Sequence, residues 1–256
     1  MTTCKNCGQQ FDHNYCPACG QKASVKKLEM KSLLQELPHA LWHLDRGFMY
    51  NLVEIFKRPG YTIKDYLEGK RKRYYHPLSF MLIILGTMYV LMHLSKIHYY
   101  DPVQDAGMTV KQAAYWKEYD DTQQLWTNRY EWFIPFTLPF MSFIYWAWLR
   151  VMKMKYTYAE SIVITFFTSA QMTIPQIFVL LLAWLFNNTA FTRTSDQVLN
   201  WSIISLIYFF QFYQLGNPVL KRSWKIILSI AGSMIMFAFA FAAVYTFLKL
   251  VNYLGG

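Results

Sequence analysis

Residues 161–192 read SIVITFFTSAQMTIPQIFVLLLAWLFNNTAFT, a run of 32 residues without Asp, Glu, Lys or Arg. A helix of about 20 apolar residues is long enough to cross the hydrocarbon core of a bilayer, which is roughly 30 Å thick. A surface helix of a water-soluble protein would instead carry a polar, charged face. This stretch therefore predicts a membrane-spanning helix, and it decides the class of the fold.

Four further stretches have the same character. Asp, Glu, Lys and Arg are absent from residues 77–95, 132–149, 197–220 and 226–248. We therefore predict an all-α polytopic membrane protein with about five transmembrane helices, whose bundle occupies residues 77–256. The approximate spans are 77–96, 132–150, 162–186, 199–216 and 226–248. The fourth has the shortest apolar run, because polar residues interrupt it at Gln211, Gln214 and Asn217-Pro218.

The distribution of charge predicts how the chain crosses the membrane. Residues 1–76 hold 13 Lys or Arg and 7 Asp or Glu, whereas residues 98–131 hold 3 basic and 6 acidic residues. Because basic segments stay in the cytosol, the N-terminus is expected inside and the 98–131 connection outside. Five crossings then place the C-terminus outside, whereas a re-entrant fourth segment would place it inside. We expect a multi-pass membrane protein, with a short amphipathic helix of residues 98–131 at the outer interface.

All four cysteines of the chain lie in its first 19 residues, as Cys4-x2-Cys7 and Cys16-x2-Cys19, each pair followed by a glycine. Such a pair lets two thiolates reach one metal ion about 2.3 Å away, and the glycine permits the positive φ of the turn. Residues 1–22 therefore predict a small Cys4 zinc ribbon. Four thiolates leave no open position, so the zinc would be structural. Two disulfides would need an oxidising compartment, and an iron–sulfur site is a further alternative.

Residues 23–76 are predicted to be a cytosolic juxtamembrane region. Their apolar residues recur at intervals of three and four, as in a helix that lies in the interface or against the bundle: Leu34, Leu37, Leu41, Leu44, Phe48, Leu52 and Ile55. Arg58-Pro59-Gly60 then predicts a turn. After it, Thr62-x-x-Asp65 predicts the capped start of a short helix that Gly69 terminates.

A basic cluster directly precedes the first span. We predict that it binds anionic phospholipid headgroups, with each cation contributing about 1 kcal/mol near the surface. The residues are Lys70, Arg71, Lys72, Arg73 and Tyr74. A pure topology anchor is the alternative. Nucleic acid is not an expected partner, because the cluster adjoins the bilayer and phospholipid headgroups would compete with it.

The first third of the chain contains a set of short motifs: Cys4-x2-Cys7-Gly8, Tyr15-Cys16-x2-Cys19-Gly20-Gln21, Asp45-Arg46-Gly47-Phe48, Arg58-x-Gly60 and Tyr66-x2-Gly69-Lys70-Arg71-x2-Tyr74-x2-Pro77. In these motifs the chain resembles a bacterial family of uncharacterised membrane proteins, classed as a domain of unknown function. The resemblance implies an N-terminal zinc ribbon joined to a multi-helix membrane domain, located in the bacterial inner membrane. It implies no established activity.

The third predicted span carries several polar residues around Pro175. We expect these side chains to face the bundle interior, where they can satisfy the backbone carbonyl that the proline frees. Gln171, Thr173 and Gln176 could form a polar path, and interhelical hydrogen bonding is the alternative. The five charge-free stretches offer no Asp, Glu, Lys or Arg, which argues against a proton pump, a voltage sensor or an intramembrane metalloenzyme.

Three classes of function follow from these features. The leading hypothesis is a membrane-anchored adaptor or regulatory protein, not an enzyme, whose cytosolic zinc ribbon binds a protein partner. The first alternative is a lipid-handling or small-solute transport protein that uses the polar path of the third span. The second alternative is an enzyme on lipid or envelope substrates, with His76 and Glu160 at the cytosolic interface. Association of two or more copies of the chain is left open.

Overall fold

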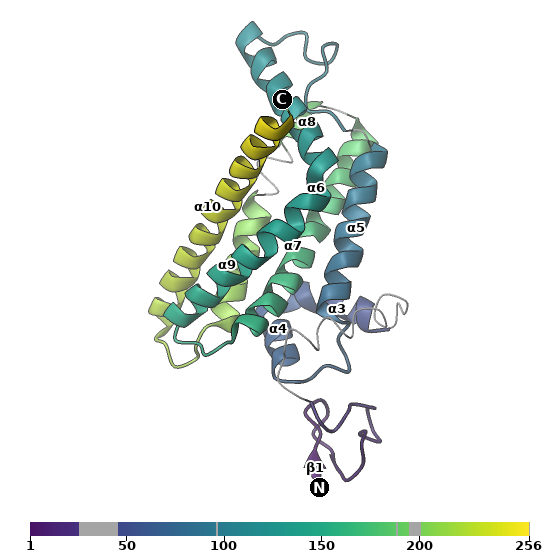
Figure 1. The fold of residues 1–256 in the computed structure, drawn as a ribbon, viewed down its shortest axis with the longest axis vertical. Coiled ribbons are helices and arrows are strands. Elements are labelled where there is room, and N and C mark those ends of the chain that lie inside the picture. The colour runs from purple at the N-terminus through teal and green to yellow at the C-terminus, as the bar shows by residue number, and fades with distance from the viewer. Residues whose placement is uncertain (26–45, 96, 188, 195–200, 256) are drawn as a thin grey trace.

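The computed structural model describes residues 1–25, 46–95, 97–187, 189–194 and 201–255. A bundle of long helices forms the body of the molecule, and a small N-terminal module lies beyond one end of it (Figure 1). We call this end of the bundle the proximal end and the opposite one the distal end. The C-terminus lies at the distal end (Figure 1).

The helices of the bundle run side by side between the two ends: α5 (Pro77–Ser95), α6 (Val110–Val151), α7 (Tyr158–Phe186), α9 (Trp201–Leu215) and α10 (Arg222–Gly255). Short helix α8 (Thr189–Thr194) lies at the distal end. The connections 152–157 and 216–221, which carry basic residues, lie at the proximal end (Figure 1). The prediction of an all-α bundle with a cysteine-bearing N-terminus is confirmed.

Among the described residues, three helical segments are long and apolar enough to span a membrane: Pro77–Ser95, Tyr158–Phe186 and Arg222–Ala240. They correspond to the first, third and fifth predicted spans. The second predicted span lies within α6, where nothing is described of the side chains of residues 126–136. The fourth lies in α9, whose 15 residues are few for a crossing. The structure therefore supports a membrane location, and five crossings with a cytosolic N-terminus stay a prediction.

Helix α6 corrects the expectation for residues 98–131. Instead of a separate interfacial helix, residues from Val110 onward form one continuous helix of 42 residues, capped by reciprocal hydrogen bonds between Thr109 and Gln112. Residues 110–134 contain neither Pro nor Gly, so nothing interrupts the helix. At 1.5 Å per residue it is about 63 Å long, twice the thickness of a bilayer core. Its N-terminal part projects beyond the distal end (Figure 1).

A buried ion pair holds the distal end together. The guanidinium of Arg193 in α8 donates to both carboxylate oxygens of Asp105 at 2.8 and 3.0 Å, and to the carbonyl oxygen of Tyr99 at 2.8 Å. It also lies 5.0 Å from the ring centre of Trp116 in α6. These contacts join segments almost 90 residues apart, so they define the packing of the connections at this end.

Two short helices complete the proximal end: α3 (Arg46–Lys57) and α4 (Pro59–Leu67). Ile55 and Ile63 are fully buried and share one core with Phe80 of α5, Phe167 of α7 and Phe212 of α9. The apolar stripe predicted for a juxtamembrane helix is confirmed within α3, where Phe48, Leu52 and Ile55 face this core. Its other members, Leu34 to Leu44, lie outside the described residues. The described part of the juxtamembrane region from Arg46 onward is thus part of the folded bundle.

Helix α4 begins three residues earlier than predicted, because Pro59 and Gly60 form its first turn and no turn precedes it. The side-chain oxygen of Gln214 in α9 accepts hydrogen bonds from the backbone N–H groups of Gly60 (2.8 Å) and Tyr61 (3.2 Å). A Cβ at Gly60 would collide with the Gln214 side chain, so glycine is needed for this contact. Thr62 lies inside the helix, and its hydroxyl donates to the Glu54 carbonyl at 3.0 Å.

Candidate metal centre and its contact with the bundle

The four cysteines converge on one point of the N-terminal module. Their sulfur atoms all lie within 4.8 Å of one another. The Cys4 and Cys19 sulfurs are 3.5 Å apart, and the Cys7 and Cys16 sulfurs are 3.6 Å apart. Neither pair is bonded as a disulfide, which would need a separation of about 2.05 Å. The predicted clustering of the four cysteines is therefore confirmed.

Two turns with the same pattern, Cys-x2-Cys-Gly-Gln, and the same backbone hydrogen bonds build this cluster, and we call them knuckle 1 (Cys4–Gln9) and knuckle 2 (Cys16–Gln21). In knuckle 1 the N–H of Gly8 donates to the Cys4 carbonyl at 2.9 Å, and the N–H of Cys4 donates to the Gln9 carbonyl at 2.9 Å. In knuckle 2 the N–H of Gly20 donates to the Cys16 carbonyl and the N–H of Cys16 donates to the Gln21 carbonyl, both at 2.8 Å. The glycines have φ of +80° and +70°, which explains why no larger residue stands there.

The sulfur cage fits a tetrahedral metal ion. Four thiolates about 2.3 Å from a shared ion are roughly 3.8 Å from one another, close to the observed separations. Burial alone would raise the pKa of the Cys19 thiol, but hydrogen bonds from the Gln21 backbone and the Asn6 side chain lower it to about 6. The thiolate that a metal needs is thus favoured at this position. The residues present could hold a metal ion with a closed shell of sulfur ligands.

The module has a very small apolar core of its own. The buried cluster consists of Cys4, Phe11 and Cys16, and strands β1 (Thr2–Thr3) and β2 (Gln10–Phe11) pair over two residues each. A structure of this size cannot supply much stability by burial of apolar surface. Metal binding would therefore provide most of the free energy that folds it.

The side chain of Gln21 joins knuckle 2 to the connection between α4 and α5. Its amide N–H donates to the Gly69 carbonyl at 2.6 Å, and its oxygen accepts from the backbone N–H groups of Arg71 and Lys72, both at 3.1 Å. Gln21 is only 4% exposed. Gln9, its equivalent in knuckle 1, is exposed to solvent. Knuckle 2 therefore docks the module onto the bundle through the hydrogen bonds of Gln21, and the equivalent glutamine of knuckle 1 does not take part in this contact.

Close approach of the backbone accompanies this contact. Gly69 has φ of +103°, and a Cβ built there would lie 2.8 Å from Cδ of Lys5 and 3.2 Å from the Val25 side chain. The predicted termination of α4 by Gly69 is confirmed, since the helix ends at Leu67. The same glycine also gives the module room to dock.

The basic cluster predicted to bind lipid is divided by the structure. The ammonium of Lys70 lies 2.6 Å from a carboxylate oxygen of Asp65, and the Tyr74 hydroxyl donates to the other oxygen at 3.3 Å. Arg71 lies over the ring of Tyr66, at 5.5 Å. Lys72 and Arg73 are exposed. Lipid binding by this cluster stays a prediction. Exposed Lys72 and Arg73 are its best-placed cations for contact with a headgroup.

The polar residues of the third span form a buried network rather than an open row. Gln171 donates through its amide to the Ile55 carbonyl at 2.9 Å and accepts from the Gln211 amide at 2.6 Å. The Gln211 oxygen in turn accepts from the hydroxyl of Tyr145 at 2.7 Å and lies 2.9 Å from the hydroxyl of Thr168. These bonds join α3, α6, α7 and α9 across the core. They are the interhelical hydrogen bonds that the sequence offered as the alternative to a polar path.

The other candidate polar residues lie apart from this network. Thr173 donates to the carbonyl of Ser169 in its own helix at 2.8 Å, and Gln176 is half-buried. Glu160 accepts from the Thr157 N–H at 2.7 Å and so caps α7. Burial, assisted by the positive charge of Arg71, lowers the pKa of His76 to about 4, which keeps its imidazole neutral. Glu160 lines a proximal pocket that His76 does not line.

A family model described as "Protein of unknown function (DUF3667)" matches residues 45–89. The matched segment contains α3, α4, the connection that receives Gln21 and most of α5. No curated protein and no solved structure matches the chain. The chain is thus similar to a family of unknown function over the segment on which the cysteine module docks.

Gln21 is the residue whose role the sequence did not reveal. It appears in the motif Cys19-Gly20-Gln21, yet nothing local distinguishes it from Gln9 in the equivalent position of knuckle 1. Its three hydrogen bonds reach residues 48 to 51 positions away. The repeated Cys-Gly-Gln was the available signal, because it marks a glutamine that follows each metal-binding turn.

Proposed function

We propose that this protein is a membrane-anchored adaptor whose N-terminal module holds a structural zinc ion and binds a protein partner at the cytosolic face of the inner membrane. Zinc is the metal ion that suits four thiolates, because the basic N-terminal segment that carries them is predicted to lie in the reducing cytosol. A closed shell of four sulfurs supplies no position for a substrate, so the metal serves the fold of the module.

One observation carries this proposal: Gln21 fixes the module to the bundle through three hydrogen bonds to backbone atoms. A module without a binding role would not need to be held at one defined place on the bundle. Held in this way, it projects from the proximal end of the bundle (Figure 1). A small folded surface presented at a fixed place loses little conformational freedom when a partner binds.

Tyr15 is the best candidate for a contact residue on that surface. It follows β2 and directly precedes the first cysteine of knuckle 2, and 59% of its surface is exposed. Exposed tyrosines often supply much of the binding energy at protein interfaces, because one rigid ring offers both apolar area and a hydroxyl.

The proposal is tested by proximity labelling from the full-length protein in its native membrane. We expect Tyr15→Ser to lose a defined set of labelled cytosolic proteins while the metal content of the purified protein is unchanged. Gln9→Ser, a change at another exposed residue of the same module, should keep the whole set. Equal labelling by the wild type, Tyr15→Ser and the Cys16→Ser variant without bound metal would overturn the adaptor role.

The transport alternative receives less support from the geometry. The amide groups of Gln171 and Gln211 are both engaged in hydrogen bonds within the core and are 2% exposed or less. A path for a polar solute would require these bonds to break. The enzyme alternative also receives less support, because Glu160 caps a helix and His76 lies elsewhere.

A further inference from the structure

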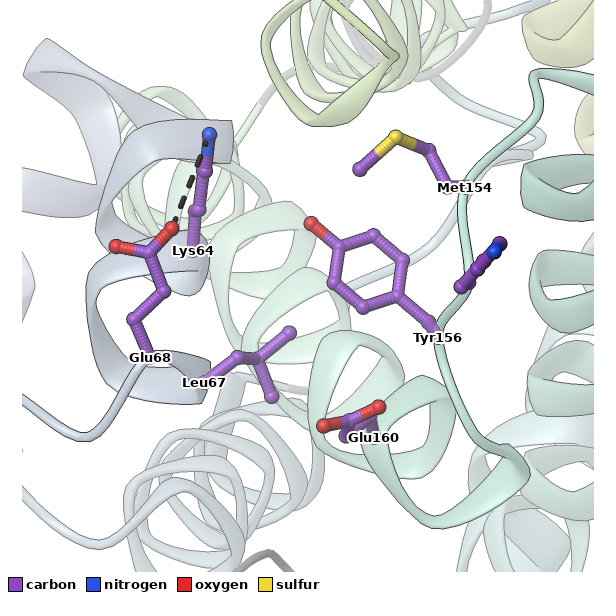
Figure 2. A pocket seen from close by; sticks show the side chains of 7 residues that line it. Lys64, Leu67, Glu68, Met154, Tyr156 and Glu160 are labelled. Atoms are coloured by element: carbon purple, nitrogen blue, oxygen red, sulfur yellow. Dashed lines mark ion pairs between the residues drawn. The ribbon is translucent and has the colours of Figure 1, made fainter.

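A pocket of about 300 Å³ opens at the proximal end, between α4 and the connection from α6 to α7. Figure 2 shows Lys64, Leu67 and Glu68 on the α4 side and Met154 and Tyr156 opposite them, with Glu160 below. Lys155 completes the lining. This volume is at the lower end of the range for small-molecule sites and suits a ligand of roughly headgroup size.

The charges around the pocket are balanced. The ionisable side chains that line it besides Tyr156 are two lysines, Lys64 and Lys155, and two glutamates, Glu68 and Glu160. The Lys64 nitrogen lies 3.8 Å from a Glu68 oxygen, a loose pair that leaves both groups capacity for further hydrogen bonds. Only one Glu160 oxygen receives the cap of α7. A ligand that satisfies this lining must therefore carry both a negative and a positive group.

A neutral hydroxyl adds a hydrogen-bond donor to the pocket. The Tyr156 hydroxyl points across the pocket towards the side of Lys64 (Figure 2). Burial, with the negative charges of Glu68 and Glu160, raises the pKa of Tyr156 to about 12. The phenol therefore stays protonated at neutral pH and can donate to an anionic oxygen.

The position of the pocket along the bundle indicates where the ligand comes from. The apolar surface of α6 reaches Val151, which is 55% exposed, and the pocket lining begins three residues later at Met154. Arg150 lies over the ring of Trp146 at 5.2 Å, and Lys225 over Tyr213 at 4.7 Å. Aromatic rings beside cations are typical of the headgroup level of a membrane. The pocket thus opens where apolar surface gives way to charge.

We propose that this pocket binds the headgroup of an aminophospholipid, a phosphate diester that carries a primary ammonium group. Lys64, Lys155 and the Tyr156 hydroxyl would hold the phosphate, and Glu68 and Glu160 the ammonium. An anionic headgroup without an amine could occupy the phosphate position, but it would leave the carboxylates of Glu68 and Glu160 without a positive partner. A quaternary ammonium has no N–H to donate to them. The chemistry of the lining therefore selects a primary amine.

The test measures lipid binding to the full-length protein, delipidated in a maltoside detergent, by native mass spectrometry. The probes are dioctanoyl phosphatidylethanolamine, phosphatidylglycerol and phosphatidylcholine, together with soluble glycerophosphoethanolamine. We expect phosphatidylethanolamine to bind about tenfold more tightly than the other two lipids, since one charge-assisted hydrogen bond is enough for such a difference. The soluble headgroup should bind more weakly than the lipid, because it lacks the acyl chains.

Variants connect the binding to the pocket. Lys155→Gln should weaken phosphatidylethanolamine binding about tenfold, and Glu68→Gln should reduce the preference over phosphatidylglycerol. Lys221→Gln removes an exposed charge at the same end without lining the pocket, and it should bind as the wild type does. Equal binding of all three lipids, or pocket variants indistinguishable from Lys221→Gln, would overturn the proposal. Equal affinity for glycerophosphoethanolamine and the lipid would overturn its membrane origin.

Discussion

Knuckle 1 and knuckle 2 have the same pattern, Cys-x2-Cys-Gly-Gln, and the same two backbone hydrogen bonds, yet their glutamines have different surroundings. Knuckle 1 ends at Gln9, which is exposed, whereas knuckle 2 ends at Gln21, which is buried against the connection between α4 and α5. The four-cysteine cluster that both knuckles build explains what they share. It does not explain why Gln21 is buried and Gln9 is not. That difference depends on the residues of the bundle that Gln21 contacts.

This difference separates two roles within 25 residues. The cysteines and glycines of both knuckles fold the module, while one glutamine determines where the module lies. A substitution in the first group should therefore affect both knuckles alike, and a substitution in the second should affect only the attachment. The predictions below test this separation, beginning with the largest expected effect.

Loss of a single sulfur should abolish metal binding from either knuckle. We expect purified Cys4→Ser and Cys16→Ser to fall equally from one metal ion per chain to almost none, because the four sulfurs share one site and the metal supplies about 10 kcal/mol or more of folding free energy. Elemental analysis by mass spectrometry measures the content. His13→Ala is the control and should keep the metal. Metal retained in one serine variant but not in the other would show that the knuckles are not equivalent.

Removal of the docking side chain should release the attachment and leave the metal bound. Gln21→Ala leaves the Gly69 carbonyl and the N–H groups of Arg71 and Lys72 without their partner, at a cost of about 1–3 kcal/mol. Hydrogen exchange at those two amides should then accelerate by about 10- to 100-fold.

Gln9→Ala is the matched control for this change. Its side chain is exposed, so exchange at residues 69–72 should stay at the wild-type rate. Both variants should contain one metal ion per chain. Unchanged exchange in Gln21→Ala would mean that other contacts, such as the one between Gly69 and Lys5, are sufficient to hold the module in place.

The parts of the structure that were predicted from the sequence depend on local or cumulative signals. The stretch 161–192 predicted α7, because the absence of charge over so many residues excludes a helix that lies at the surface of a water-soluble protein. The cysteine spacing predicted the four-cysteine cluster, because each C-x2-C turn can direct two sulfur atoms to one point. Phe48, Leu52 and Ile55 give the buried face of α3, since a helical repeat is visible over a few residues.

The parts that were missed depend on single contacts between distant residues. Gln214 caps α4 from 154 positions away, so the first turn at Pro59 and Gly60 looked like a simple loop. Arg193 pairs with Asp105 across 88 positions, although its nearest acidic residue in the chain is Asp196. Helix α6 was divided in two because its composition changes from polar to apolar, whereas its backbone does not change. The repeat of apolar residues along the sequence contains no information about such contacts between distant residues.

The smallest expected effect concerns the glycines of the knuckles. Alanine at φ near +70° or +80° costs about 1 kcal/mol, so Gly8→Ala and Gly20→Ala should each weaken metal affinity about fivefold in competition with a chelator. A Cβ at Gly8 meets nothing within 4 Å, and one at Gly20 meets Cε of Lys72 at 3.4 Å, an ordinary contact with a flexible side chain. The two variants should therefore agree within a factor of about two. A much larger loss in Gly20→Ala would show that backbone packing, and not Gln21 alone, distinguishes knuckle 2 from knuckle 1.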